Sequence, residues 1–156
     1  MRSLQTYTSG VILALVLAAF VSCTPGSCIE ETNAFLKASF YLNQTGIPRP
    51  PDSLTLYGLG MDTSKIYNKA VKVQPALLPL NADTLSCSFV IRIEGISDTI
   101  RFWYSTYPHL VSLECGYTFY HMLADSLAFS NNIIDTIIIR KSTITTLNEE
   151  NIRIFY

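Results

Sequence analysis

Residues 84–93, TLSCSFVIRI, alternate between apolar and polar side chains over a full strand length. Ser86, Ser88 and Arg92 share one face of this segment, and the opposite, apolar face holds Leu85, Cys87, Phe89, Ile91 and Ile93. A period of two residues is typical of a β-strand with one buried and one solvated face. The rest of the chain is rich in β-branched and aromatic residues and nearly lacks helical periodicity. The chain is therefore limited to an all-β fold.

Further segments carry the same kind of strand pattern and are separated by clusters of turn-forming Gly, Pro, Asn and Asp residues. The expected strands are residues 34–42, 53–58, 71–77, 84–93, 99–105, 110–120, 135–141 and 151–156, with a short piece at 65–67. Residues 122–128 are the one place where a helical turn or a long crossover is expected. Seven to eight short strands with this spacing predict a single antiparallel β-sandwich of the immunoglobulin-like kind.

The N-terminal residues read as a targeting segment rather than as part of the fold. Residues 11–21, VILALVLAAFV, form an uninterrupted apolar run that follows Arg2. The run is shorter than the roughly 20 residues that a membrane-spanning helix needs, and it is typical of a cleaved secretory signal peptide. A buried N-terminal helix is the alternative, but no polar face is present to make it amphipathic. We therefore expect a signal peptide over residues 1–22.

Cys23 is the candidate lipidation site. The residues before it, Phe20-Val21-Ser22, resemble a bacterial lipobox, in which the cysteine is acylated and becomes the new N-terminus. Phe20 stands where Leu is usual, and ordinary secretory cleavage is the competing interpretation. Acyl chains would tether the protein to a membrane, since each buried methylene contributes about 0.8 kcal/mol. The expected organisation is a signal peptide (1–22), a lipidated tether (23–33) and a β-sandwich domain (34–156).

Charge and motif content exclude several functional classes. The eleven Lys and Arg residues less Arg2 face twelve Asp and Glu residues, so the exported chain lacks the basic face that nucleic-acid binding requires. His109 and His121 stand outside any CxxC or HExxH spacing, and neither a metal nor another cofactor is expected. The chain has no GxSxG motif, and we expect that it is not an enzyme. An unrecognised carboxylate site is the alternative, which would require two Asp or Glu side chains in one cleft.

Three thiols remain if Cys23 is acylated, and an exported small domain with several cysteines usually joins two of them. Cys87 and Cys115 each fall on the inward face of an expected strand, while Cys28 lies in the tether. The residues alone therefore leave all three pairings open.

The six aspartates are each followed by Ser or Thr, and five of these pairs continue with an aliphatic residue. One interpretation is mechanical, because Asp ends a turn by accepting backbone N–H groups and the next residues begin a strand. The other is that Asp-(Ser/Thr)-aliphatic resembles the O-glycosylation motif of Bacteroidetes envelope proteins. The candidate acceptors are then Ser53, Thr84, Thr99, Ser126 and Thr136.

Aromatic residues gather in residues 101–110, RFWYSTYPHL. On a strand, Phe102 and Tyr104 face one way and Trp103 faces the other, so one aromatic must be out of phase with the core. An exposed Trp103 is a candidate binding surface, able to stack on a sugar or pack against a protein partner. The alternative is that a second sheet or a loop covers it.

Several motifs together resemble a family of small Bacteroidetes lipoproteins, family six-four-five-two of the domains of unknown function. They are the anchor Cys23 followed by CIEET, then LTLYGLGMDT (54–63), LPLN (78–81), ECGYTF (114–119), IDTIII (134–139) and the ending NEENIRIFY. The resemblance implies that Cys28 and Cys115 are the recurrent cysteines, which favours their pairing, and that Cys87 is particular to this chain. The family has no assigned activity to transfer.

Taken together, these features predict a lipid-anchored protein of the cell envelope with a non-catalytic binding or structural role. The acidic run that marks surface-exported lipoproteins does not follow Cys23, so outer-membrane anchorage facing the periplasm is expected. Its expected partners are the membrane, through the lipid on Cys23, and an envelope protein or a glycan. Carbohydrate binding by exposed aromatics is the alternative function.

Overall fold

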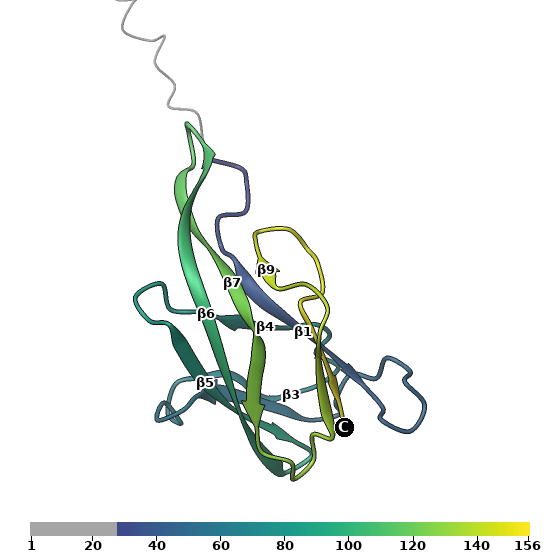
Figure 1. The fold of residues 1–156 in the computed structure, drawn as a ribbon. Coiled ribbons are helices and arrows are strands. Elements are labelled where there is room, and N and C mark those ends of the chain that lie inside the picture. Colours follow the sequence, from purple (N-terminus) through teal and green to yellow (C-terminus); the bar gives the residue numbers. More distant parts are fainter. Residues whose placement is uncertain (1–27) are drawn as a thin grey trace, which may run out of the picture.

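The computed structural model describes residues 28–156 of the chain (Figure 1). The regular elements in this range are all β-strands, so the predicted all-β fold is confirmed. Within the same residues, no helix is long and apolar enough to span a bilayer. The expected signal peptide (1–22) and the expected lipidation site, Cys23, lie outside the described residues.

Ten strands form the two sheets of the sandwich. The four-stranded sheet has the order β4-β1-β10-β8, with β1 (Phe35–Tyr41), β4 (Ala76–Pro79), β8 (Thr136–Ile139) and β10 (Ile152–Phe155). The six-stranded sheet has the order β3-β2-β5-β6-β7-β9, with β2 (Leu54–Gly58), β3 (Lys65–Ala70), β5 (Ser86–Ile93), β6 (Ile96–Ser112), β7 (Gly116–Phe129) and β9 (Thr143–Ile144). The strand count exceeds the expected seven to eight partly because β9, only two residues long, carries too little sequence to show alternation.

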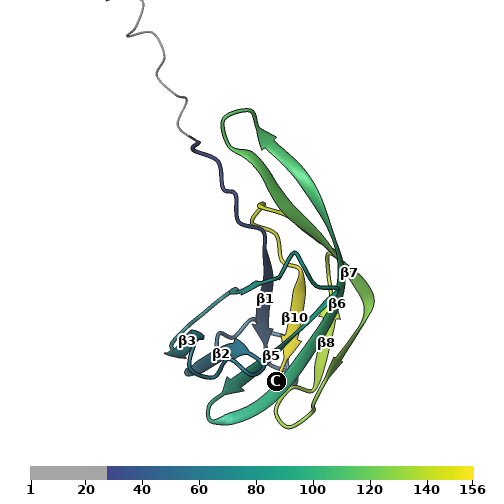
Figure 2. The ribbon, with the colours of Figure 1, turned by 90° about the vertical axis from the view of Figure 1, so that its left-hand side faces the viewer.

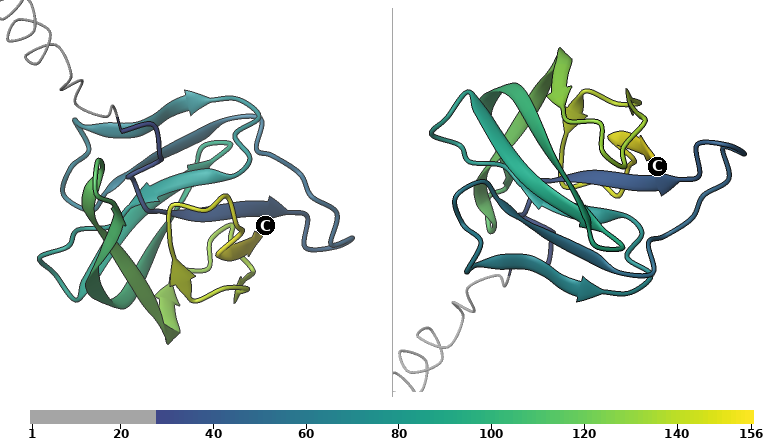
Figure 3. Two further views of the ribbon diagram at one scale, coloured as in Figure 1. Left: turned by 90° about the horizontal axis from the view of Figure 1, so that it is seen from above. Right: turned by 90° about the horizontal axis from the view of Figure 1, so that it is seen from below.

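β1 and β10 run parallel at the centre of the four-stranded sheet. Their register pairs Ala38 with Ile152 and Tyr41 with Phe155. The other strand pairs of both sheets are antiparallel, as expected. The views from above and below show the C-terminus beside β1 (Figure 3). One parallel pair therefore joins the first and last strands of the described chain.

The core lies between the two sheets and follows the predicted alternation. Phe89, Ile91 and Ile93 of β5 are buried, whereas Leu85, which was expected on the same face, lies before β5 and is exposed. Phe40 and Phe102 enter the core from opposite sheets and are almost wholly buried. Burial of a side chain of this size contributes about 1.5–3 kcal/mol. The alternating apolar faces therefore supply much of the free energy that holds the sheets together.

β6 and β7 form a hairpin that extends well beyond the sandwich (Figures 1 and 2). They are 17 and 14 residues long, whereas an average strand has about five or six. β5 pairs with β6 only as far as Trp103, and β9 pairs only with His121 and Met122. We call residues 106–120, where β6 and β7 pair with each other alone, the hairpin arm.

The expectation of one strand over residues 110–120 was wrong, because a turn at residues 113–115 divides this segment between β6 and β7. Ser112 Oγ accepts a hydrogen bond from the Cys115 N–H at 3.0 Å, and Gly116 adopts a φ of 72°. Hydroxyl-to-backbone bonds and a left-handed glycine are typical of turns. Pro108 lies within β6, where β6 is an edge of the sheet and the missing N–H is tolerated.

Residues 122–128 continue β7 and form neither a helical turn nor a crossover. The alternation fails there because the register with β6 shifts: Phe102 pairs with Leu127, but Tyr104 pairs with Leu123. Two extra residues on β7 therefore lie opposite Trp103. Such a bulge bends a strand and increases its twist. The break in periodicity that suggested a helix is the sequence signature of this bulge.

Candidate functional site

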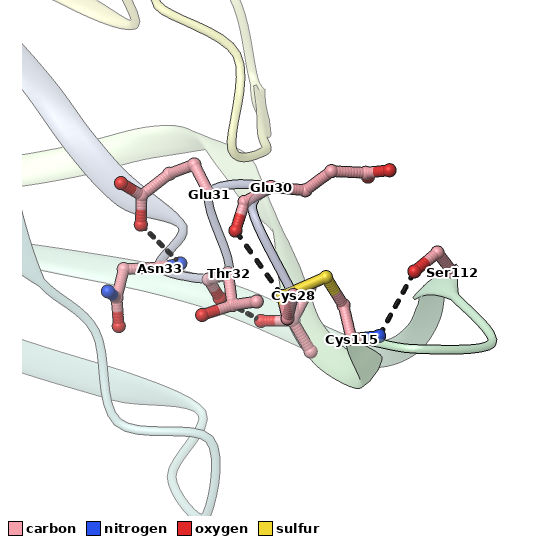
Figure 4. The surroundings of a disulfide bond; sticks show 8 residues. Cys28, Glu30, Glu31, Thr32, Asn33, Ser112 and Cys115 are labelled. Carbon is pink, nitrogen blue, oxygen red and sulfur yellow. Dashed lines mark hydrogen bonds between the residues drawn. A yellow bond between two sulfur atoms is a disulfide. The ribbon is translucent and has the colours of Figure 1, made fainter. Parts of the chain in front are cut away.

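Cys28 forms a disulfide with Cys115 in the turn at the end of the hairpin arm (Figure 4). The two residues are 87 positions apart in sequence, and their Cα atoms are 4.7 Å apart. The pairing implied by the family resemblance is therefore confirmed. Cys115 lies in a turn, however, and not on the inward face of a strand as the alternation suggested. This position lets Cys28 reach it from the N-terminal segment.

The N-terminal segment has a second attachment to the arm. Thr118 Oγ1 donates a hydrogen bond to the Thr32 carbonyl oxygen at 2.5 Å. Residues 32–35 also line one wall of a shallow cleft of about 190 Å³, whose other wall includes Phe119 and His121. The segment between the disulfide and β1 is thus fixed to the hairpin arm at two points, Cys115 and Thr118.

The end of the hairpin arm exposes large apolar side chains. Leu110 pairs directly with Tyr117, and Pro108 pairs with Phe119, so these four side chains share one face of the arm. Tyr117 is 74% exposed, Phe119 is 52% exposed, and Leu113 in the turn is 89% exposed. We call Leu110, Leu113, Tyr117 and Phe119 the apolar tip. The sequence prediction missed the tip because it did not find the turn that brings these residues together.

The hairpin arm and residues 28–36, which are bonded to it, contain no Lys or Arg. No Lys or Arg occurs between Arg101 and Arg140 or between residues 28 and 36, two segments that include the whole arm and the chain bonded to it. Glu30, Glu31 and Glu114 lie beside or near the disulfide and are exposed. The tip is therefore apolar with an acidic surround.

Trp103 lies on the outer face of β6, away from the core, and its side chain is 38% exposed. The Arg101 guanidinium lies 5.8 Å from the centre of its ring, a cation–π distance. Further along the same face, Tyr107 contacts Tyr120 edge to face, and His109 stacks on Tyr120 with ring centres 4.2 Å apart. Part of Trp103 is therefore uncovered. Trp103, Tyr107, His109 and Tyr120 lie on the same outer face of the hairpin, and we call them the aromatic row.

Cys87 is half-buried against the core and is the free cysteine of the described residues. Burial raises the pKa of its thiol to about 11, because the charged thiolate is poorly solvated there. A thiol with so high a pKa is a weak nucleophile at neutral pH. Cys87 is therefore a packing residue and not a reactive one.

The two histidines lie apart in the structure as in the sequence. His121 is buried, hydrogen-bonded to Thr106 Oγ1 through Nδ1 at 2.9 Å, and packed edge to face on Tyr104. Burial lowers the pKa of His121, which favours the neutral ring. His109 is exposed on the outer face of the arm. Residues 28–156 contain no cluster of three or more His, Cys, Asp or Glu side chains arranged to hold a metal ion.

The five candidate O-glycosylation sites differ in exposure. Thr84, Ser126 and Thr136 are exposed, whereas Ser53 and Thr99 are half-buried. The hydroxyl of Thr84 is also hydrogen-bonded to the Tyr104 hydroxyl at 3.0 Å. Exposure therefore favours Ser126 and Thr136 as acceptors, and their modification stays a prediction.

Asp98, which precedes Thr99, has a structural role. Its carboxylate accepts hydrogen bonds from Ser130 Oγ and from the backbone N–H groups of Asn132, Ile133 and Ile134. These contacts fit the mechanical interpretation of the Asp-(Ser/Thr) pattern at this position. The same role does not extend to Asp135, whose side chain is exposed.

An open groove of about 680 Å³ runs between β7 and β8, where the two sheets separate at one edge of the sandwich. Leu127 and Phe129 line one side, Ile137 and Ile139 line the other, and Asp125 and Arg140 contribute charge. This groove was not predicted from the sequence, because it depends on how far apart the two sheet edges lie.

Comparison with known protein families matches residues 53–156 to the Family of unknown function (DUF6452). The matched range begins just before β2 and extends through β10, so it includes the whole hairpin arm and Cys115. No curated protein and no solved structure matches the chain.

Proposed function

The chain belongs to the Family of unknown function (DUF6452), and on this premise we propose that it is a lipid-anchored domain of the cell envelope with a non-catalytic binding or structural role. Cys23 carries the lipid, and residues 1–22 are removed as a signal peptide. The domain is anchored to the outer membrane and faces the periplasm.

The observation that carries this proposal is the Cys28–Cys115 disulfide. Disulfides persist in oxidising compartments such as the periplasm and are rare in the reducing cytosol. The apolar run over residues 11–21 and the lipobox-like residues before Cys23 agree with export followed by anchoring. Cys28 therefore ties the segment just after the proposed anchor to the folded domain.

A non-catalytic role is supported by how the buried polar groups are used. Asp98 is saturated by hydroxyl and backbone donors, and the pKa of Cys87 is too high for a reactive thiolate. Asn151 holds backbone groups of Lys37, Lys141 and Thr143. These polar side chains stabilise the fold, and their hydrogen-bonding capacity is already engaged.

Carbohydrate binding is a second candidate function, favoured by the aromatic row on the outer face of the hairpin. A half-exposed Trp103 in line with Tyr107 and Tyr120 offers flat apolar surfaces for sugar rings. A shift of Trp103 fluorescence on adding cell-envelope glycans, absent from Trp103→Ala, would support this function. No change in Trp103 fluorescence across a broad panel of glycans would count against carbohydrate binding.

The intact mass of protein purified from native membranes tests the anchor. We expect a chain that begins at Cys23 and carries acyl groups. Alkylation under denaturing conditions should modify one cysteine before reduction, Cys87, and three after it. Repeated glycan increments on the same mass would decide whether the Asp-(Ser/Thr) sites are modified.

Cys23→Ser is the variant that tests the assignment of the anchor, and Cys87→Ser is its control. Cys23→Ser should carry no acyl groups and should leave the membrane fraction, whereas Cys87→Ser should be acylated as usual. A wild-type mass with a free Cys23 and no lipid would rule out the anchor.

A further inference from the structure

We propose that the apolar tip of the hairpin arm inserts into the headgroup region of the membrane that holds the anchor. The partner is a phospholipid surface without net charge. This inference rests on the proposed acylation of Cys23 and adds a second, non-covalent contact with the same membrane.

The disulfide keeps the tip close to the anchor. Cys23 lies five residues before Cys28, and a fully extended chain spans at most about 3.5 Å per residue. Cys28 is bonded to Cys115, the residue between Glu114 and the start of β7. With the 4.7 Å between the two Cα atoms of the disulfide added to that span, Cys115 in the turn is held within about 22 Å of the acylated residue, whatever path the connecting residues take.

The side chains at this end of the molecule suit a membrane interface. Leu113 and Tyr117 are among the most exposed large apolar residues of the described chain, and Ile29, next to the disulfide, is 91% exposed. Aromatic residues with one polar end, such as Tyr117, are enriched where hydrocarbon meets water. An exposed apolar cluster is typical of an interaction site, and the surface nearest to the apolar tip is the bilayer that holds the anchor.

The charges around the tip indicate which lipids it contacts. Binding to anionic membranes depends on Lys and Arg residues near the surface, each contributing about 1 kcal/mol. The arm and the N-terminal segment bonded to it have none, and Glu30, Glu31 and Glu114 would be repelled by anionic headgroups. A zwitterionic surface therefore fits the tip. The same carboxylates remain in water, which limits insertion to the depth of the headgroups.

The geometry of the arm sets how the rest of the domain sits. From Thr106 to Ser112 the arm contains seven residues of β6, which extend about 23 Å at 3.3 Å per residue. Figure 2 shows the arm pointing away from the two sheets. With its tip in the membrane, the arm holds the sandwich away from the bilayer, and the aromatic row and the groove between β7 and β8 stay accessible to other molecules.

Fluorescence quenching of the lipidated full chain tests the position of the tip. Trp103 is the single tryptophan, so Trp103→Phe provides a background into which one new tryptophan can be placed. Leu113→Trp reports on the tip. Leu59→Trp is the matched control, because Leu59 is also exposed. Its N–H bonds to the Ser88 carbonyl oxygen, and Ser88 pairs with Arg101, which lies twelve residues before Leu113.

The protein is reconstituted into phosphatidylcholine vesicles with brominated or unmodified acyl chains. Bromine should remove about half of the Leu113→Trp emission and about a tenth of the Leu59→Trp emission, since a tryptophan at headgroup depth adjoins the upper carbons of the acyl chains and a tryptophan held away from the bilayer does not. Reduction of the disulfide should lower the quenching of Leu113→Trp by at least about twofold, because Cys115 in the turn is then no longer held within about 22 Å of the anchor. Adding phosphatidylglycerol should leave the quenching unchanged or weaken it.

Equal quenching of the two variants, in protein whose mass shows the acyl chains, would overturn the inference and leave the anchor in place. A mass without acyl chains would instead overturn the proposed anchor, and the inference with it. Blue-shifted Leu113→Trp emission in native membranes without quenching in pure lipid would mean that a protein covers the tip, which would also overturn the inference.

Discussion

The Oδ2 atom of Asp98 lies 2.9 Å from the amide nitrogen of Ile134, and the side chain of Asp98 is almost fully buried. Its carboxylate also accepts hydrogen bonds from Ser130 Oγ and from the amides of Asn132 and Ile133. A carboxylate near the start of β6 thus fixes the loop that carries the chain from the six-stranded sheet to β8 of the other sheet.

We expect Asp98→Asn to lower the free energy of unfolding by about 1.5–3 kcal/mol, the range for hydrogen bonds to a charged group. The amide keeps one acceptor oxygen, but its NH₂ group faces backbone N–H donors that lose their partner. Urea denaturation measures the change. Asp135→Asn is the control, since Asp135 begins the same Asp-Thr-Ile pattern but is exposed, and it should change stability by less than about 0.5 kcal/mol.

Asp98 also gives the domain a specific sensitivity to acid. Burial alone would raise its pKa, but the hydrogen bonds from Ser130 and three backbone amides outweigh it and hold the pKa below its usual value. The stabilisation is therefore complete above the unfolded-state pKa of about 3.9 and is lost as the pH falls through the lower folded-state pKa. Stability curves of wild type and Asp98→Asn should converge below about pH 4; parallel curves would contradict this role.

Removing the disulfide in Cys28→Ser/Cys115→Ser should cost less than the chain-entropy value. A closed loop of this length is worth about 4–5 kcal/mol if only the unfolded chain gains freedom. Cys28 and the turn at residues 113–115 lie outside the core, so without the disulfide these segments gain conformational entropy in the folded protein too. This gain offsets part of the entropy gained by the unfolded chain. Urea denaturation should show a loss of about half that value, and hydrogen exchange should rise in the arm. A full loss of about 4–5 kcal/mol would show that the sandwich depends on the bridge.

Cys87 should resist alkylation in the folded protein. Because burial raises its pKa to about 11, the thiolate fraction at pH 8 should be about a hundredfold lower than in the unfolded chain. Iodoacetamide labelling followed by intact mass, with and without urea, gives the two rates. Labelling of native protein at the unfolded rate would mean that the strand end around Cys87 opens readily.

Asn151→Asp should destabilise the protein strongly at neutral pH. Asn151 Nδ2 donates to the carbonyl oxygens of Lys141 and Thr143, while its Oδ1 accepts the Lys37 N–H at 2.9 Å. A carboxylate would direct an oxygen at two carbonyls, at a cost of about 3 kcal/mol. This environment raises the pKa of the new carboxyl, so the deficit should shrink as the pH falls through that pKa. Asn68→Asp on exposed β3 is the control and should show no such pH dependence.

The sequence predicted burial correctly where the alternation within a single strand decides which side chains face the core. The alternation around Phe89 and Ile91 predicted that these side chains lie on a buried face, and both are buried between the two sheets. The Cys28–Cys115 pair was implied by family resemblance and not by geometry, because the turn that exposes Cys115 was not recognised. Local pattern and resemblance together therefore gave the fold class and the covalent link.

The features that escaped prediction depend on residues far apart in sequence. The bulge opposite Trp103 is defined by the register between β6 and β7, and single-strand periodicity carries no register. The parallel pairing of β1 with β10 and the groove between β7 and β8 depend on how the sheets close. The apolar tip was missed because the sequence predicted one continuous strand over residues 110–120, whereas a turn at residues 113–115 divides it.

The parallel pairing of β1 with β10 imposes an order on folding. The Lys37 N–H of β1 donates to the Asn151 side-chain oxygen, 114 residues later, and the Lys37 carbonyl oxygen accepts the Asn151 N–H. This edge of β1 therefore cannot pair until the segment around β10 is available. The consecutive strands β5, β6 and β7 meet no such delay, because neighbouring antiparallel strands close short loops. β1 can therefore pair with β4, and this meander can form, before the partner of β1 on its other side is available. The four-stranded sheet is completed last, because β10 is the strand that joins β1 to β8.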